Sequence, residues 1–108
     1  MAFLYITEYA ELSIGPAGRV GQMPKDPPVA EQVVVIGAGS LQSAAFNAKT
    51  RFVRLHCDVA AEVLIGTNPT AVLNTTGRMA ANQTEYRDVS DGVRSGTAFK
   101  VAVIAPTV

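Results

Sequence analysis

Residue types that commonly carry chemistry are scarce in this sequence. Cysteine and histidine occur once each, as Cys57 and His56, and tryptophan does not occur. A single cysteine excludes an intrachain disulfide and weakly favours a reducing compartment. One cysteine and one histidine also supply too few ligands for a zinc site unless several carboxylates join them. We therefore expect no metal site at these residues.

Charge and long apolar runs are scarce as well. Nine basic and nine acidic residues give a net charge of zero. The chain therefore has no overall positive charge that would attract nucleic acid or an anionic membrane. No run approaches the roughly 18 apolar residues of a membrane-spanning helix. The N-terminal MAFLYITEYAE lacks the basic region of a secretory signal and meets Glu8 early. We expect a soluble protein made in a cytoplasm that binds neither nucleic acid nor membrane.

Turn formers and β-branched residues make up much of what is present. Their spacing favours short strands joined by turns, and a chain of 108 residues fits one domain. Residues 67–77 and 90–97 are rich in turn formers, whereas residues 40–50 fit either a short helix or a strand. We predict strands at residues 2–9, 32–37, 51–59, 62–66, the end of 78–89, and 98–105. This pattern indicates an all-β sandwich or barrel, with core strands at 32–37, 51–59, 61–66 and 98–104.

The clearest alternation of apolar and polar residues lies in RFVRLHCDV, residues 51–59. A strand there places one set of side chains in the core and the other on a wetter face; the first set is Val53, Leu55, Cys57 and Val59, and the second is Phe52, Arg54, His56 and Asp58. Adjacent strand residues point to opposite faces, so His56 and Cys57 cannot act as a nucleophile and its base. We interpret Cys57 as a core residue and His56 as a surface residue paired with Asp58.

The stretch VVVIGAGS, residues 33–40, resembles the start of a dinucleotide-binding fold. Gly37 and Gly39 match the first two fingerprint glycines, and Asp58 lies at the distance of the ribose-binding acid. The third position is Gln42, however, and too few residues remain for several βαβ units. A small Rossmann-like dinucleotide-binding protein is therefore kept only as an alternative, and the glycines are interpreted as a strand exit.

Residues 13–30 contain four of the six prolines and three of the nine glycines. Such a stretch cannot hold a helix and holds a ladder poorly. We predict an N-terminal strand followed by an extended arm over residues 1–30, and a β-sandwich domain over residues 31–108.

No P-loop, serine elbow or spaced carboxylate pair is present in the sequence. We therefore predict that the chain is not an enzyme, with no catalytic residue and no cofactor. Lys49, Arg51 and Arg54 cluster in the sequence, either on a solvated strand face or as a docking patch for an acidic partner surface.

Four stretches resemble the capsid decoration, or cement, proteins of tailed bacteriophages: FNAKTRFVRLHCD, VLIGTNPTA, GRMAANQTEY and FKVAVIA, within residues 44–105. The resemblance implies a jelly-roll-like antiparallel β-sandwich with an extended N-terminal arm. It also implies a structural virion protein on the capsid exterior, which binds the major capsid protein and itself, as a homodimer or homotrimer.

Under this hypothesis the partner-binding residues are Phe3, Tyr5, Tyr9, Met23, Arg51 and Arg54. Large apolar residues and arginines are the usual anchors of protein interfaces. The alternative for Phe3 and Tyr5 is that they belong to the first core strand. Two further functions remain open: a tail or head–tail structural or receptor-binding sandwich, and the dinucleotide-binding protein described above.

Overall fold

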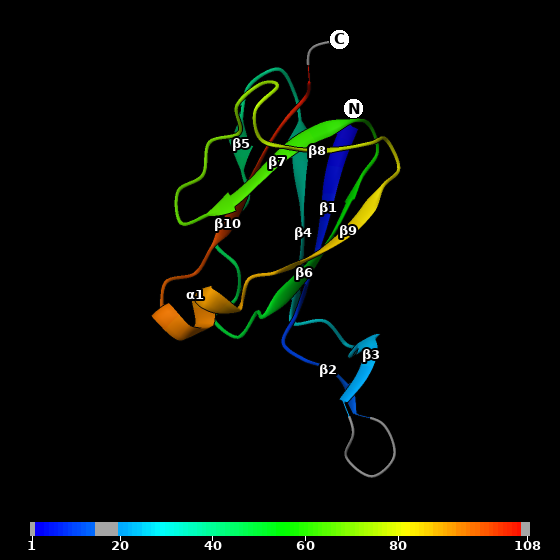
Figure 1. Cartoon of the computed structure of the whole chain (residues 1–108), viewed down its shortest axis with the longest axis vertical. Helices are drawn as coiled ribbons and strands as arrows, with labels where there is room; N and C mark the ends of the chain where they lie inside the picture. Colours follow the sequence, from blue (N-terminus) through cyan, green and yellow to red (C-terminus); the bar gives the residue numbers. More distant parts are fainter. Residues whose placement is uncertain (1, 15–19, 107–108) are drawn as a thin grey trace.

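The computed structural model describes residues 2–14 and 20–106, which build two packed antiparallel sheets and a projecting hairpin (Figure 1). One sheet has the strand order β4-β1-β6-β9, and the other has the order β5-β10-β7-β8. The elements are β1 (Ala2–Tyr9), β2 (Leu12–Ile14), β3 (Val20–Pro24), β4 (Ala30–Ile36), β5 (Leu41–Gln42), β6 (Phe52–Cys57), β7 (Ala61–Gly66), β8 (Gly77–Met79), β9 (Thr84–Asp88), α1 (Ser90–Ser95) and β10 (Lys100–Ile104). The predicted all-β sandwich is confirmed.

The core lies between the sheets and follows the alternation in the sequence. Val53, Leu55 and Cys57 of β6 are fully buried, as predicted, and pack with Val101 and Val103 of β10. Burying such a side chain contributes about 1.5–3 kcal/mol. Val59, which was predicted to share this face, is 40% exposed because β6 ends at Cys57.

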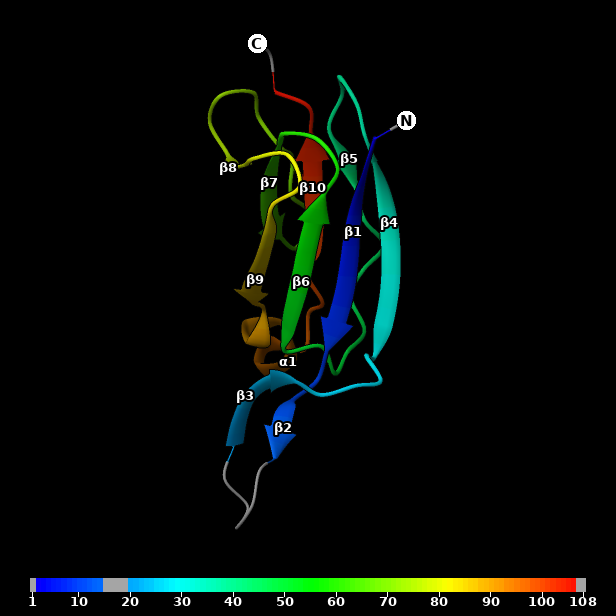
Figure 2. The same cartoon turned by 90° about the vertical axis from the view of Figure 1, so that its right-hand side faces the viewer.

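The strand β1 is part of the sandwich, so the sandwich starts at Ala2 and not at residue 31. β1 lies between β4 and β6, with Tyr5 opposite both Val33 and His56 (Figure 2). Leu4 and Ile6 are buried in the core. Their period-2 spacing sends the intervening Phe3 and Tyr5 outward, so these two residues do not belong to the core.

The predicted extended arm is in part a two-stranded hairpin. β2 and β3 pair antiparallel beyond the end of the sandwich, and the Lys25 Nζ lies 3.5 Å from Glu11 Oε2 near the base of the hairpin (Figure 2). Pro24 is the last residue of β3, opposite Leu12, and the prolines at 27 and 28 follow the strand, so none of them lies inside the ladder. Residues 15–19 of the predicted arm lie outside the described residues.

The structure decides or corrects three segments. Residues 40–50, which fitted either a helix or a strand, form the two-residue strand β5 and then an irregular path. The strand predicted at the end of 78–89 is confirmed as β9, whereas β8 was not predicted and the predicted turn at 90–97 holds the short helix α1. The helix is specified locally, because Asp88 Oδ1 accepts from the Ser90 N–H at 2.8 Å and Gly96 ends the helix with a φ of 73°.

Gly37 and Gly39 lie in a turn that leads to β5, and no helix follows them in this described stretch. The neighbour of β4 in its sheet is antiparallel, whereas a dinucleotide-binding fold needs parallel strands joined by a crossover helix. The Rossmann-like alternative is therefore wrong for the fold. Within residues 2–14 and 20–106, no helix has the length and apolarity to cross a membrane.

Candidate partner-binding surface

The sheet β4-β1-β6-β9 turns one face to the core and the other outward, and we call the second the outer face. Strand alternation assigns its side chains. They are Glu31, Val33 and Val35 from β4, Phe3, Tyr5, Thr7 and Tyr9 from β1, Phe52, Arg54 and His56 from β6, and Thr84, Tyr86 and Asp88 from β9. Seven of these residues are apolar or aromatic, counting Tyr but not His. An exposed sheet face of this composition is unusual for a water-facing surface.

One apolar area, the valine–aromatic patch, consists of Phe3, Tyr5, Val33 and Val35. Phe3 lies opposite Val35, and Tyr5 lies opposite Val33, across the β1–β4 ladder. The Phe3 and Tyr5 ring centroids are 6.2 Å apart. Val33 is 54% exposed and Tyr5 is 39% exposed. Cross-strand pairs hold these side chains in place while leaving them open to a partner.

A row of three aromatic rings crosses the other end of the outer face. Tyr9 stacks on Phe52 with the ring centroids 5.2 Å apart, and Phe52 meets Tyr86 at 6.5 Å. Exposure increases along the row, from the buried Tyr9 to the 54% exposed Tyr86. The buried Tyr9 ring therefore packs against Phe52 and holds it in place, while Phe52 and Tyr86 present the accessible ring surface.

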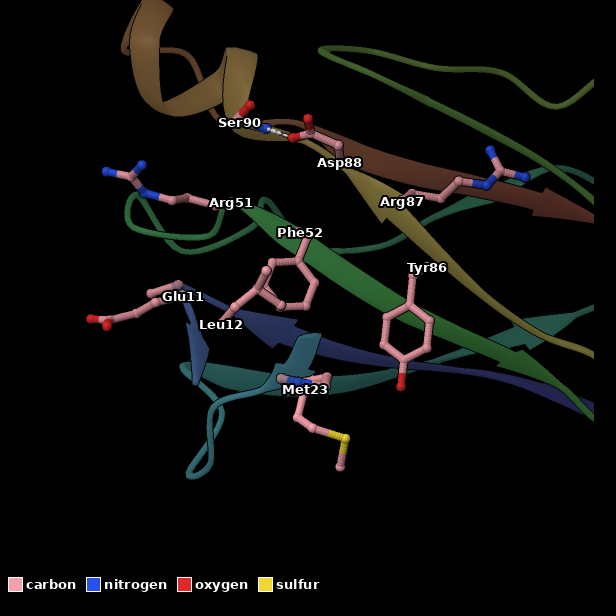
Figure 3. Close-up of a pocket in the computed structure, with 11 residues that line it drawn as sticks. Glu11, Leu12, Met23, Arg51, Phe52, Tyr86, Arg87, Asp88 and Ser90 are labelled. Carbon is pink, nitrogen blue, oxygen red and sulfur yellow. Dashed lines mark hydrogen bonds between the residues drawn. The ribbon is translucent and has the colours of Figure 1, made fainter. Parts of the chain in front are cut away.

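An open groove of about 980 Å³ lies between this row and the β2–β3 hairpin, and we call it the hairpin groove. Phe52 and Tyr86 line it from the sheet, and Leu12 and Met23 line it from the hairpin (Figure 3). Met23 is 70% exposed. The other lining residues are Ala10, Glu11, Pro24, Arg51, Arg87, Asp88 and Ser90. Four large apolar side chains in one concavity are typical of a site that accepts an apolar group.

The charges around the hairpin groove are mostly engaged with one another. Glu11 pairs with Lys25 at 3.5 Å, and the Arg87 guanidinium pairs with Glu85 at 2.7 Å. Two lining residues, Arg51 and Asp88, form no ion pair within the described residues. Asp88 accepts a hydrogen bond from the Ser90 N–H, whereas the exposed Arg51 side chain has no hydrogen bond in this part of the chain and points outward in Figure 3. The free guanidinium makes this rim of the groove suited to a carboxylate.

A buried carboxylate fixes the segment that leads into the groove. Glu8, only 2% exposed, accepts from the Asn47 N–H at 2.7 Å and from the Thr50 hydroxyl at 2.8 Å. The Gln32 amide donates to the other Glu8 oxygen at 3.1 Å. Because a buried charge is tolerated only when it is hydrogen-bonded, these bonds hold residues 47–50 and so place Arg51 and Phe52.

Among the described residues, the surroundings of three groups shift their pKa. Burial raises the pKa of the Tyr9 hydroxyl, with the Asp26 carboxylate acting in the same direction. Burial also raises the pKa of the Cys57 thiol, which keeps the thiol protonated and unreactive at neutral pH. The Ser90 backbone N–H lowers the pKa of Asp88 at the edge of the hairpin groove. Tyr9 and Cys57 are thus neutral structural groups, as their buried positions require.

The structure brings most of the predicted partner-binding residues onto one side of the molecule. Phe3, Tyr5 and Arg54 lie on the outer face, and Met23 and Arg51 border the hairpin groove. Tyr9 is buried and can act only through Phe52.

Sequence reasoning missed Leu12, Phe52 and Tyr86 as parts of the surface. The alternation in residues 51–59 had placed Phe52 beside Arg54 and His56, and it was the available signal. No sequence pattern shows that the hairpin lies next to β9, since that juxtaposition depends on the turn at Ala10 and Glu11.

His56 lies on the outer face, as expected, but its contact differs from the prediction. The His56 Nδ1 lies 2.8 Å from the Thr84 hydroxyl, the cross-strand neighbour in β9. A pairing with Asp58 does not form, because β6 ends before that residue. No three of the described histidine, cysteine and acidic residues gather as metal ligands.

No family model, curated protein or solved structure matches this chain.

Proposed function

We propose that this chain is a non-catalytic binding protein that docks onto another protein through its outer face and hairpin groove. The observation that carries the proposal is the aromatic row of Tyr9, Phe52 and Tyr86 beside an open apolar groove with a free arginine at its rim. Aromatic and arginine side chains on a rigid support are the residues that dominate binding energy in protein interfaces.

The support for a protein partner is geometric. The outer face is held by cross-strand pairs, and the Glu8 hydrogen bonds hold the segment before Phe52, so this wall of the groove requires little ordering on binding. The groove is open rather than enclosed, and its lining joins a strand face to a projecting hairpin (Figure 3). A convex or extended segment of a partner, with an apolar residue next to a carboxylate, fits this shape and charge.

The sequence resemblance supports a more specific partner, the major capsid protein on the outside of a tailed-phage head. In this proposal the chain is a decoration protein that strengthens contacts between capsid subunits in the virion. Many copies on a symmetric shell compensate for modest affinity at each site.

We also propose that the sandwich is a jelly roll with a circularly permuted strand order. From β4 to β10 the chain alternates between the sheets, except for the β7–β8 pair, and β1 takes the place between β4 and β6 that a last strand would fill. In support, the Ala105 N–H donates to the Gly37 carbonyl at 2.8 Å, while Ala2 pairs with the adjacent Ile36. Both ends of the described chain thus lie at one end of β4, as a permutation requires.

The test is co-sedimentation of the purified chain with phage heads that lack it. We expect saturable binding, and we expect Phe52→Ala and Tyr86→Ala each to weaken it at least tenfold, which corresponds to about 1.4 kcal/mol or more. Val72→Ala is the matched control, because Val72 is 49% exposed but lies in the loop over the other sheet.

The result decides between the proposals. Binding to tails instead of heads would replace the decoration role with a tail or head–tail role. If Phe52→Ala and Val72→Ala weaken binding to heads equally, this result would contradict the proposal that the outer face is the docking surface.

A further inference from the structure

The strand β4 forms an open edge of the sandwich. It is the first strand in the order β4-β1-β6-β9, and no strand within the described residues pairs with its other side. Figure 2 shows it along one margin of the molecule. In an antiparallel ladder alternate residues direct their amide and carbonyl groups away from the neighbour. β4 therefore presents a row of backbone donors and acceptors along its seven residues.

The opposite edge of the same sheet, β9, is protected against pairing. Its five residues TEYRD include three charged side chains, whereas the seven residues AEQVVVI of β4 include only Glu31. Charged residues and short length are the usual ways to prevent edge-to-edge association. β4 has neither protection along its VVVI segment, and Val33 and Val35 are exposed on its outer side.

The sequence of β4 is complementary to itself in the antiparallel direction. When two copies pair about Val34, each Val33 lies opposite the Val35 of the other copy, and Gln32 lies opposite Ile36. Facing β-branched residues stabilise antiparallel ladders. Glu31 then lies opposite Gly37, so no like charges meet.

We propose that β4 pairs antiparallel with the β4 of a second copy about Val34, which joins the two four-stranded sheets into one of eight strands. The two valine–aromatic patches become continuous across the twofold axis. The contact uses the same strand on both copies and is therefore closed, while the charged β9 edges stop further growth. This inference stands independently of what the outer face binds.

The test measures the mass of the full chain by light scattering and by sedimentation over a range of concentrations. We expect twice the 11.3 kDa of the monomer at high concentration. The double variant Val33→Glu with Val35→Glu places like charges opposite each other across the axis, and we expect its dissociation constant to rise at least tenfold. The matched double variant Val33→Glu with Val35→Lys places opposite charges there, and we expect it to remain dimeric.

Circular dichroism and thermal melting establish that both double variants fold. Amide hydrogen exchange gives a second readout, since the outward amides of residues 30–36 should gain protection as concentration rises. A wild-type monomer or trimer at high concentration would overturn the inference. Equal dissociation constants for the two folded double variants would overturn it as well.

Discussion

The outward faces of the two sheets differ in how far a loop of the chain covers their apolar side chains. Outside the sheet β5-β10-β7-β8, Ala102 and Ile104 are buried beneath Ala71 of the loop over residues 67–76. Hydrogen bonds that hold this loop include those from the Ala71 N–H to Ser40 Oγ at 2.9 Å, from the Asn74 N–H to Glu62 Oε2 at 2.9 Å, and from the Gln42 amide to the Pro69 carbonyl at 2.6 Å and to Asn68 Oδ1 at 2.9 Å. On the other sheet, no segment in the described part of the chain covers Val33, Tyr5 or Tyr86 on the outer face.

The exposed aromatic side chains therefore belong to the outer face of the sheet β4-β1-β6-β9, and the sheet β5-β10-β7-β8 has no matching aromatic face among the described residues. The same sequence covers Ala102 and Ile104 of one sheet with its own loop, although Leu41 and Leu64 of that sheet stay exposed, and leaves Phe52 and Tyr86 lining a groove on the other. Since covering apolar surface stabilises a protein by about 25 cal/mol per Å², an apolar sheet face left open supports the proposal that a partner covers it. The covered side should therefore govern stability, and the open side should govern binding.

The largest expected effect comes from Ile104→Ala on the covered side. The side chain is 6% exposed and packs with Ala71 and Ala102, so its removal leaves a cavity. We expect a loss of about 2–4 kcal/mol in the free energy of unfolding, measured with denaturant. Val33→Ala is the comparison on the open side, where we expect a loss below about 1 kcal/mol. Equal losses would mean that the two sides do not differ in this way.

We expect a smaller change in the free energy of unfolding when the loop over residues 67–76 loses one of its hydrogen bonds. Glu62 is 2% exposed and accepts from the Asn74 N–H. We expect Glu62→Ala to lower the free energy of unfolding by about 1–3 kcal/mol, because a partly buried amide loses its acceptor. Glu62→Gln retains an acceptor oxygen and should lose less. Hydrogen exchange over residues 67–76 would locate the loosening, and an unchanged loop would contradict this role.

The smallest effect concerns Asp88 at the edge of the hairpin groove. Its lowered pKa means that it stabilises the folded state above the unfolded pKa of about 3.8, and that this contribution is lost as pH falls through the folded pKa. Because the group is exposed, we expect Asp88→Asn to lower Tm by only about 1–2 °C at pH 7. The difference from wild type should vanish in acid. A difference that grows as pH falls would contradict this assignment.

The sequence was a good guide where packing followed a simple period. The alternation in residues 51–59 predicted the buried Val53, Leu55 and Cys57, and the strands at 2–9, 62–66 and 98–105 were confirmed. It was a poor guide where tertiary contacts decide the outcome. β5 and β8 have two and three residues, too short for a periodic signal, and they exist because β10 and β7 offer partners.

The candidate surface was only partly predictable for the same reason. Phe3, Tyr5 and Arg54 were assigned from residue type, and their common face follows from strand alternation and pairing. The role of Glu8 was missed, because its three donors come from residues 24 to 42 positions away. Contacts over such separations leave no local pattern in the sequence.

The most direct test of the central claim is electron cryo-microscopy of phage particles assembled with this chain. We expect density for the sandwich on the outside of the head, with the hairpin groove and the Phe52–Tyr86 rings against the capsid surface and the loop over residues 67–76 directed away. Density in which that loop makes the contact, or heads without density for the chain, would contradict the claim.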